Sequence, residues 1–203
     1  YRISNLLNEL EKYPDLKRIR YTTSHPADMT EDLIECYSSN KKLMPFIHLP
    51  IQSGSNKILK LMNRKHKVED YLDIHNKLLK INPLIKISSD FIVGYPGETE
   101  DDFNELLDFV KLSKFDRLGV FTYSHEEDTH AYNLVDDVPD NIKHERAEQI
   151  MELQSSISYE LNQKKLGNIY NVLIDRKEAG YFIGRTEFDS PDVDNEVLVK
   201  SDD

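Results

Sequence analysis

Two short stretches place glycine among polar side chains directly after apolar, strand-like runs. The first, HLPIQSGSN, carries His48 in the run, followed by Gln52, Ser53, Gly54 and Ser55. An amide and two hydroxyls beside a glycine can hydrogen-bond a ribose or a carboxylate while the backbone comes close. The alternative is structural, with Ser55 as the N-cap of a following helix. These residues alone leave both interpretations open.

The second stretch, SSDFIVGYPGETEDDF, places two glycines and a proline just after a buried run. Gly94 and Gly97 permit backbone angles closed to other residues, and Pro96 stiffens the turn between them. A purine can lie against such a backbone edge and receive amide hydrogen bonds from Ile92 and Val93. The structural alternative is a tight connection between a strand and a helix.

Other titratable residues are interpreted as structural. Glu98 stands at the start of the next helix, where the helix dipole favours a carboxylate, so we expect it to organise the turn. The stretch VFTYSHEEDTHAY is rich in titratable groups, but its spacing fixes no metal geometry, and a solvated loop is expected. Cys36 falls within a helical pattern and is expected to be a small buried residue. No metal ligand and no catalytic residue is assigned.

The elements that must position these residues alternate between strand and helix. Strand signals lie at residues 18–24, at the start of 46–55, and at 85–95 and 115–124. Helical patterns lie between them at residues 28–37, 56–63, 68–81 and 99–113. Repeated β-α units with near-continuous apolar strands predict an α/β fold with a parallel sheet, open or closed into a barrel. Ligands of such folds bind at the carboxyl ends of the strands, where both glycine stretches fall.

The pattern changes after residue 138. A long helix is expected from Pro139 to about Leu166, with Gly167 as its stop residue. Three short strand runs then predict a small antiparallel β domain. The expected units are part of a barrel over residues 1–138, a linker helix over 139–167 and an incomplete β domain over 168–203.

Composition narrows the functional classes. The net charge of −11 argues against non-specific binding to nucleic acid. No apolar run approaches the length of a membrane span, and no signal peptide opens the chain. A single cysteine excludes an internal disulfide and predicts a reducing, cytoplasmic location. The chain opens inside a helical pattern and ends just past a strand-like run, so we expect a fragment of a longer protein.

Three stretches, RIRYTTSHP, HLPIQSGSNKILKLMNRKH and ISSDFIVGYPGETEDDF, resemble the central strands of the radical S-adenosylmethionine methylthiotransferases in order, spacing and residue detail. The resemblance covers essentially the whole chain. It implies a partial radical-SAM (β/α) barrel followed by a small β domain of the TRAM type. It also implies that S-adenosylmethionine binds at the barrel mouth, with contacts from His48, Gln52, Ser53, Asp90, Ile92, Val93, Gly94 and Tyr123.

Members of that family hold two [4Fe-4S] clusters, one on a CxxxCxxC loop and one on three further cysteines. This chain has one cysteine, whereas a cluster needs at least three thiolates. The resemblance therefore implies that the cluster ligands lie outside this chain and that the chain alone is inactive. A non-catalytic interaction module is the alternative.

The two halves of the chain resemble different branches of the family. RIRYTTSHPADMT and HLPIQSGSN resemble the MiaB-type branch, which methylthiolates isopentenyl-adenosine beside the anticodon of tRNA. FDRLGVFTYSHEEDTHAYNLVDDVP and GRTEFDSPDVDNEV resemble the RimO-type branch, which methylthiolates an aspartate of a small-subunit ribosomal protein, the S-twelve protein. The pattern is that of a hybrid joined between residues 91–99 and 115–119.

The charge of the β domain favours the ribosomal protein as partner. Residues 168–203 contain four basic and nine acidic residues. A domain that binds tRNA is expected to be basic, whereas an acidic surface favours binding to a basic protein. Asp189, Asp192 and Asp194 are expected to contact that partner. Asp192 and Asp194 lie in a turn-rich stretch after Pro191 and are expected to project into solvent. A tRNA substrate is the alternative.

Overall fold

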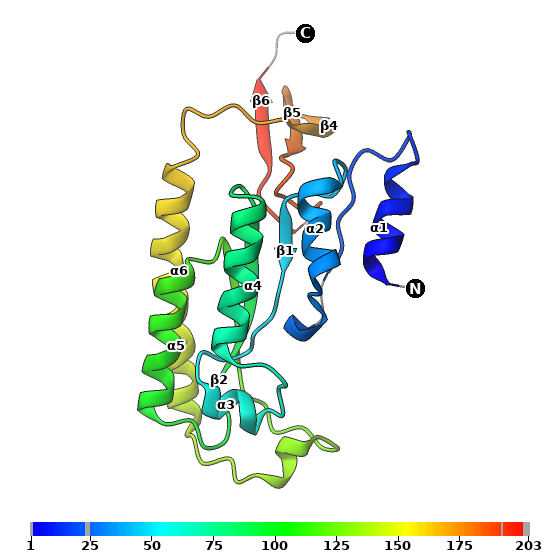
Figure 1. The fold of residues 1–203 in the computed structure, drawn as a ribbon. Coiled ribbons are helices and arrows are strands. Elements are labelled where there is room, and N and C mark those ends of the chain that lie inside the picture. The colour runs from blue at the N-terminus through cyan, green and yellow to red at the C-terminus, as the bar shows by residue number, and fades with distance from the viewer. Residues whose placement is uncertain (1, 23–24, 192, 201–203) are drawn as a thin grey trace.

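The computed structural model describes residues 2–22, 25–191 and 193–200 (Figure 1). Its first sheet has three parallel strands in the order β1 (Phe46–His48), β2 (Lys86–Val93) and β3 (Arg117–Thr122). Helices connect and cover them: α1 (Ile3–Glu11), α2 (Glu31–Ser39), α3 (Asn56–Leu61), α4 (Val68–Ile81) and α5 (Glu100–Ser113), with short 3-10 turns at Pro26–Asp28 and His130–Asn133. The α/β fold with a parallel sheet, part of a barrel, is confirmed.

Side-chain alternation along β2 gives the sheet a covered face and an open face. Phe91 and Val93 are buried in the core, where the ring of Phe91 packs edge-on against that of Phe109 in α5, with centroids 6.1 Å apart. Successive residues of a strand point to opposite sides. The intervening residues Ser88, Asp90 and Ile92 therefore share the other face, where Ser88 is buried and Asp90 and Ile92 are partly exposed.

The strand expected over residues 18–24 is wrong for the residues that the structure describes. Ile19 alone pairs there, as an isolated parallel bridge to Leu43. Its amide donates to the Lys42 carbonyl at 2.7 Å, and its carbonyl accepts from the Met44 amide at 2.9 Å. One bridge keeps the segment beside the sheet without forming a ladder. Residues 23 and 24 lie outside the described residues.

Helix α6 (Asp140–Gln163) follows the first sheet and leads to the second. It begins after Pro139 as expected, but it ends at Gln163, ahead of the expected end near Leu166. The second sheet is antiparallel, in the order β4 (Leu173–Glu178), β5 (Tyr181–Arg185) and β6 (Val197–Lys200), which confirms the small β domain. In the described part of the chain, no helix combines the length and apolarity needed to cross a membrane.

Arginines at the amino ends of the strands hold the β domain against the first sheet. Arg117, the first residue of β3, contacts Asp189 at 2.6 Å and Asp194 at 3.0 Å. Arg20 lies 3.9 Å from the second oxygen of Asp194. The guanidinium groups of Arg20 and Arg117 also lie over the ring of Phe46, at 4.4 Å and 5.2 Å. Two carboxylates of the β domain thus meet two cations of the barrel.

The expectation that Asp194 projects into solvent is therefore wrong, and Asp189 is buried as well. Asp189 is 5% exposed, and the side chain of Asp194 is 7% exposed. Buried carboxylates need charged or hydrogen-bonding partners, and the barrel arginines supply them. Asp192 lies outside the described residues. Because two of the three aspartates bind within the molecule, they give no argument for a basic partner.

The β domain and the two glycine-containing loops, residues 49–55 after β1 and 94–98 after β2 (the glycine turns), occupy opposite ends of the parallel strands (Figure 1). The eight residues of β2 separate these ends by about 25 Å at the rise of a β-strand. A ligand at the glycine turns is therefore out of reach of the Arg117 ion pairs.

Replacing both Asp189 and Asp194 by asparagine is expected to lower the free energy of unfolding by about 3 kcal/mol, because the half-buried Arg117 loses both charged partners. Urea denaturation followed by circular dichroism measures the change. The control is Asp108→Asn, which removes the exposed ion pair to Lys111 and is expected to change stability by less than about 1 kcal/mol. Equal small losses in both variants would contradict the role of the interface.

Candidate functional site

The loops after β1 and β2 meet at the carboxyl ends of the strands, as expected. Gln52 and Phe91 form a parallel bridge in which the Gln52 amide donates to the Asp90 carbonyl at 3.0 Å. The Gln52 carbonyl accepts from the Ile92 amide at 2.9 Å. Gln52 has φ +83°, a conformation that costs a non-glycine residue about 1–3 kcal/mol and often marks a functional position.

One carboxylate, that of Asp102 in α5, joins the two loops. From the first loop it accepts the Ser55 hydroxyl at 2.8 Å and the Lys57 ammonium at 2.6 Å. From the second it accepts the amide and the hydroxyl of Thr99, at 2.8 Å and 2.6 Å. Lys57 also donates to the Gly97 carbonyl at 2.9 Å. Asp102 therefore fixes how the loops lie relative to each other.

The environment of Asp102 keeps it ionised. Burial raises the pKa of its carboxyl, but hydrogen bonds from Lys57, Thr99 and Ser55 outweigh burial and lower the pKa from 3.8 to about 2. Asp102 is 6% exposed, so solvent screens these contacts little. Nothing in TEDDF distinguishes Asp102 from its acidic neighbours, so the sequence alone does not point to this residue.

The glycine and serines of the first loop have close partners within the chain. A Cβ at Gly54 would lie 2.6 Å from the Leu106 Cα, so the glycine admits α5 and not a ligand. Ser53 is 1% exposed, and its hydroxyl accepts from the Ser55 amide at 3.2 Å. Ser55 is the N-cap residue of α3, but its hydroxyl bonds to Asp102 instead of the helix backbone. Gln52 remains partly exposed.

The turn from Gly94 to Glu98 is held from inside by the Glu98 carboxylate, which organises the turn as predicted. It accepts from the Gly94 amide at 2.8 Å and from the Arg146 guanidinium at 2.8 Å. Gly94 has φ +70°, and a Cβ there would lie 2.2 Å from the Lys143 Cγ. Residue 94 must therefore be glycine both for its backbone angle and for the space that Lys143 fills.

The expected amide donors for a purine are partly in use. The Ile92 amide already donates to Gln52, so it is not free to donate to a ligand. Val93 is fully buried in the core, and its carbonyl accepts from the Tyr123 amide at 2.9 Å. Ile92 can still offer its half-buried side chain, whereas the Val93 side chain faces away from the open face.

A row of polar side chains, His48, Ser88 and Asp90, crosses the open face of the sheet beside two apolar side chains, Ile92 and Phe121. His48 Nδ1 lies 2.8 Å from the Ser88 hydroxyl, and His48 Nε2 lies 3.2 Å from an Asp90 oxygen. Ile92 pairs in register with Phe121, which is 57% exposed. A flat ring can lie on these apolar side chains while hydroxyls meet the polar ones. Phe121 is not among the residues expected at the site, although its register with Ile92 follows from the parallel pairing.

Tyr123 follows β3 and lies beside the Gly94 turn. Its ring packs edge-on against Tyr95, with centroids 5.2 Å apart, and its hydroxyl lies 3.1 Å from His125 Nδ1. Residues 124–130 are exposed, in agreement with a solvated loop. Among the residues with described positions, no group of His, Cys, Asp and Glu side chains is arranged to hold a metal ion. Cys36 is 2% exposed, and burial raises the pKa of its thiol.

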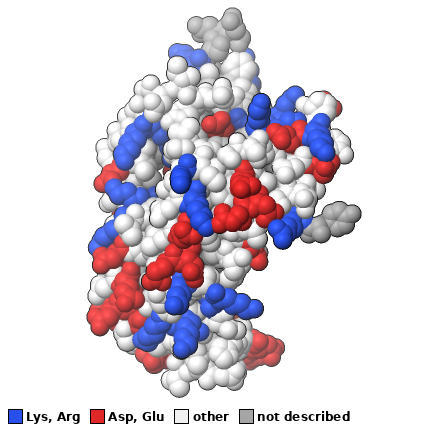
Figure 2. Space-filling model, viewed as in Figure 1, with Lys and Arg blue, Asp and Glu red and all other residues white. Residues whose placement is uncertain are grey.

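A basic segment borders the Gly94 turn. It comprises Lys60, Arg64, Lys65 and Lys67, with no acidic residue between positions 56 and 68. The hydroxyl of Tyr95 donates to the carbonyl of residue 61 at 3.2 Å, which ties the segment to the turn. Figure 2 shows basic side chains at the end of the molecule where α3 lies in Figure 1.

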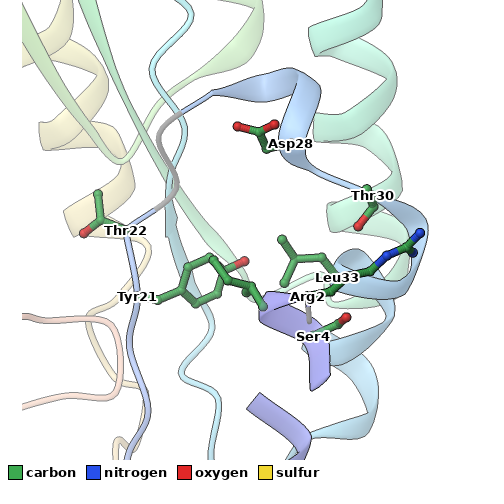
Figure 3. Close-up of a pocket in the computed structure, with 8 residues that line it drawn as sticks. Arg2, Ser4, Tyr21, Thr22, Asp28, Thr30 and Leu33 are labelled. Carbon is green, nitrogen blue, oxygen red and sulfur yellow. The ribbon is translucent and has the colours of Figure 1, made fainter. Parts of the chain in front are cut away.

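A separate cavity of about 330 Å³ opens between α1 and the start of α2 (Figure 3). Its lining consists of Arg2, Ile3, Ser4, Tyr21, Thr22, Asp28, Thr30 and Leu33. This lining includes none of the predicted cofactor contacts. The cavity adjoins the segment around the Ile19 bridge and not the loops joined by Asp102.

Two family models match the chain. The radical SAM superfamily matches residues 2–110, and the TRAM domain matches residues 166–203. Among solved structures, coproporphyrinogen III oxidase (HemN) from Escherichia coli, a radical SAM enzyme, superposes with a TM-score of 0.61. It is 21% identical, and the match covers 76% of this chain and 36% of that one, so it supports the fold alone.

Curated relatives of two kinds are similar to the chain. The ribosomal protein uS12 methylthiotransferase RimO of Christiangramia forsetii is 49% identical over 97% of this chain and 44% of that protein. Its counterpart in Cytophaga hutchinsonii is 46% identical over 99% of this chain and 46% of that protein. The tRNA-2-methylthio-N(6)-dimethylallyladenosine synthase of Rickettsia canadensis is 46% identical over 93% and 43%. The chain thus spans less than half the length of these relatives.

Because folding lowers the pKa of Asp102, its contribution to stability is complete above about pH 4 and is lost as the pH falls toward 2. Asp102→Asn is expected to lower the free energy of unfolding at pH 7 by about 2 kcal/mol and to flatten its decline between pH 4 and pH 2. Urea denaturation at a series of pH values measures both effects. The control is Asp101→Asn, at an exposed neighbouring position. Parallel pH curves for the wild type and Asp102→Asn would contradict the assignment.

Proposed function

This chain belongs to the radical SAM superfamily, and we propose that it is part of a methylthiotransferase, an enzyme that inserts a methylthio group at an unactivated C–H bond. The observation that carries the proposal is the joining of two loops by Asp102 at the carboxyl ends of adjacent parallel strands. Relatives 46–49% identical over 97–99% of the chain bear the name methylthiotransferase, which supports the reaction class.

We propose S-adenosylmethionine as the ligand of the open face. Ile92 and Phe121 offer an apolar surface for the adenine, and the polar pair His48 and Asp90 can bind the ribose hydroxyls. The strained Gln52 presents an amide side chain suited to the methionyl carboxylate or ammonium. When bound, this cofactor would supply the methyl group and, after one-electron reduction by an iron–sulfur cluster, the radical that removes a hydrogen atom from the substrate. The chain's own residues bind and orient it.

An iron–sulfur cluster does not fit this chain. Its one cysteine is buried in α2, and a cluster needs at least three thiolates. We propose that the cluster ligands lie in a part of the protein outside this chain. The 203 residues alone are then expected to bind S-adenosylmethionine without cleaving it.

For the substrate we propose an aspartate of the ribosomal protein uS12. Support comes from the RimO relatives, which match this chain at 46–49% identity through both the barrel and the β domain. The charge of the β domain no longer contributes to the choice, since Asp189 and Asp194 bind arginines within the molecule. The proposal therefore depends on similarity and not on surface charge.

A tRNA substrate is the second candidate, and the basic segment favours it. Lys60, Arg64, Lys65 and Lys67 border the proposed cofactor site, where they suit a phosphate backbone and would repel a basic protein. The Rickettsia relatives, named as tRNA-modifying synthases, are 45–46% identical over 93% of the chain.

Two hybrid enzymes separate the candidates. In the first hybrid, this chain replaces the matching segment of the Christiangramia forsetii relative. In the second hybrid, this chain replaces the matching segment of the Rickettsia canadensis relative. If the chain directs substrate choice toward protein, both hybrids are expected to methylthiolate uS12, as detected by mass spectrometry of the protein and of tRNA nucleosides. Methylthiolated adenosine from both hybrids would assign the chain to tRNA. Unmodified parent enzymes serve as controls for each substrate.

A further inference from the structure

We propose that the first turns of α6 belong to the cofactor site, because Arg146 and Lys143 set the backbone of the turn from Gly94 to Glu98. This inference rests on the proposed function, which assigns that turn to the adenosyl part of the cofactor. It gives α6 a positioning role in addition to its place between barrel and β domain.

Arg146 reaches the turn through a buried ion pair. Arg146 is 6% exposed, and its guanidinium contacts the Glu98 carboxylate at 2.8 Å and the Glu98 carbonyl at 3.3 Å. A second nitrogen lies 3.3 Å from Glu100. Well-packed apolar residues often stabilise a protein as much as a buried ion pair does, so stability alone does not account for the Arg146–Glu98 pair. The pair instead indicates that the geometry around Glu98 must be fixed. The atom it fixes is the Glu98 oxygen that accepts the Gly94 amide.

Lys143 reaches the same turn from one helical turn earlier. It is 3% exposed, and its Cγ lies 2.2 Å from the position of a Cβ at Gly94. Its ammonium contacts Asp136 at 2.7 Å and lies 5.3 Å from the centre of the Tyr123 ring. The stem of Lys143 therefore packs directly against Gly94, and its ammonium lies over the ring of Tyr123.

The segment before α6 completes the contact. Asp137 accepts the Gly97 amide at 2.7 Å, so residues 136–146 touch both glycines of the turn. A turn with two residues at positive φ has few internal constraints of its own. Contacts from outside the turn must then determine its conformation. Residues 136–146 make such contacts at Gly94, Gly97 and Glu98.

Loss of Arg146 is expected to disturb the turn through Glu98. Burial raises the pKa of Glu98, and the Gly94 amide and Arg146 oppose that rise. Without the guanidinium, the buried Glu98 carboxyl group takes up a proton more readily, and a neutral carboxyl group accepts a weaker hydrogen bond from the Gly94 amide. The backbone between Ile92 and Gly94 then loses its fixed position against the proposed adenine surface.

The test compares Arg146→Gln with Gln154→Leu in the full 203-residue chain. Gln154 is also buried on α6, but it donates to the Phe115 carbonyl at 2.9 Å and does not touch the turn. Both variants are expected to lose thermal stability. Hydrogen exchange of the Gly94 amide reports on the turn, and calorimetric titration with S-adenosylhomocysteine, which carries the same adenosyl group, reports on the site.

Arg146→Gln is expected to speed Gly94 amide exchange and to weaken S-adenosylhomocysteine binding about tenfold, whereas Gln154→Leu leaves both near wild type. Arg146→Lys, which keeps one charged contact, is expected to recover part of the affinity. Equal effects of Arg146→Gln and Gln154→Leu would overturn the inference. So would faster exchange with unchanged affinity, which would limit Arg146 to a structural role. Failure of the wild-type chain to bind S-adenosylhomocysteine would instead overturn the proposed cofactor site. In that case the hydrogen-exchange comparison alone would decide whether Arg146 sets the turn.

Discussion

The buried carboxylate of Asp102 is the contact on which the arrangement of this protein's site depends. It lies in the first turn of α5 and hydrogen-bonds to side chains that follow two different strands. Parallel pairing brings the strand ends together, but pairing does not determine how the loops beyond them fold. Asp102 supplies that constraint from the covered side of the sheet. The Glu98–Arg146 pair supplies a second constraint on the turn that follows β2.

The two ends of the parallel sheet carry different kinds of electrostatic contact. At the amino ends, Arg20 and Arg117 bind aspartates of the β domain and hold it in place. At the carboxyl ends, charged groups fix loops and leave His48, Asp90 and Phe121 partly open. Two of the acidic residues in 168–203, Asp189 and Asp194, thus serve domain docking, and the proposed cofactor site lies at the other end of the strands.

Periodicity and turn chemistry predicted the elements because each depends on neighbours in sequence. Helix α5 follows from its apolar spacing, and Glu98 was correctly expected to organise its turn from its place at a helix start. Contacts between distant segments were not predictable in this way. Asp194 follows Pro191 in a turn-rich stretch, which favours exposure, whereas its partner Arg117 lies over 70 residues earlier in the chain. The same holds for Lys143 above Gly94 and for Leu106 against Gly54.

The measurement that tests the central claim most directly is a ¹⁵N NMR titration of the chain with S-adenosylhomocysteine. The claim is that the loops joined by Asp102 and the open face beside them form one adenosyl-binding site. We predict amide shift changes concentrated at Gln52, at residues 90–94 and at Tyr123, with little change in the β domain. Shift changes confined to the cavity lined by Tyr21, Asp28 and Leu33, or no saturable changes at all, would contradict the account.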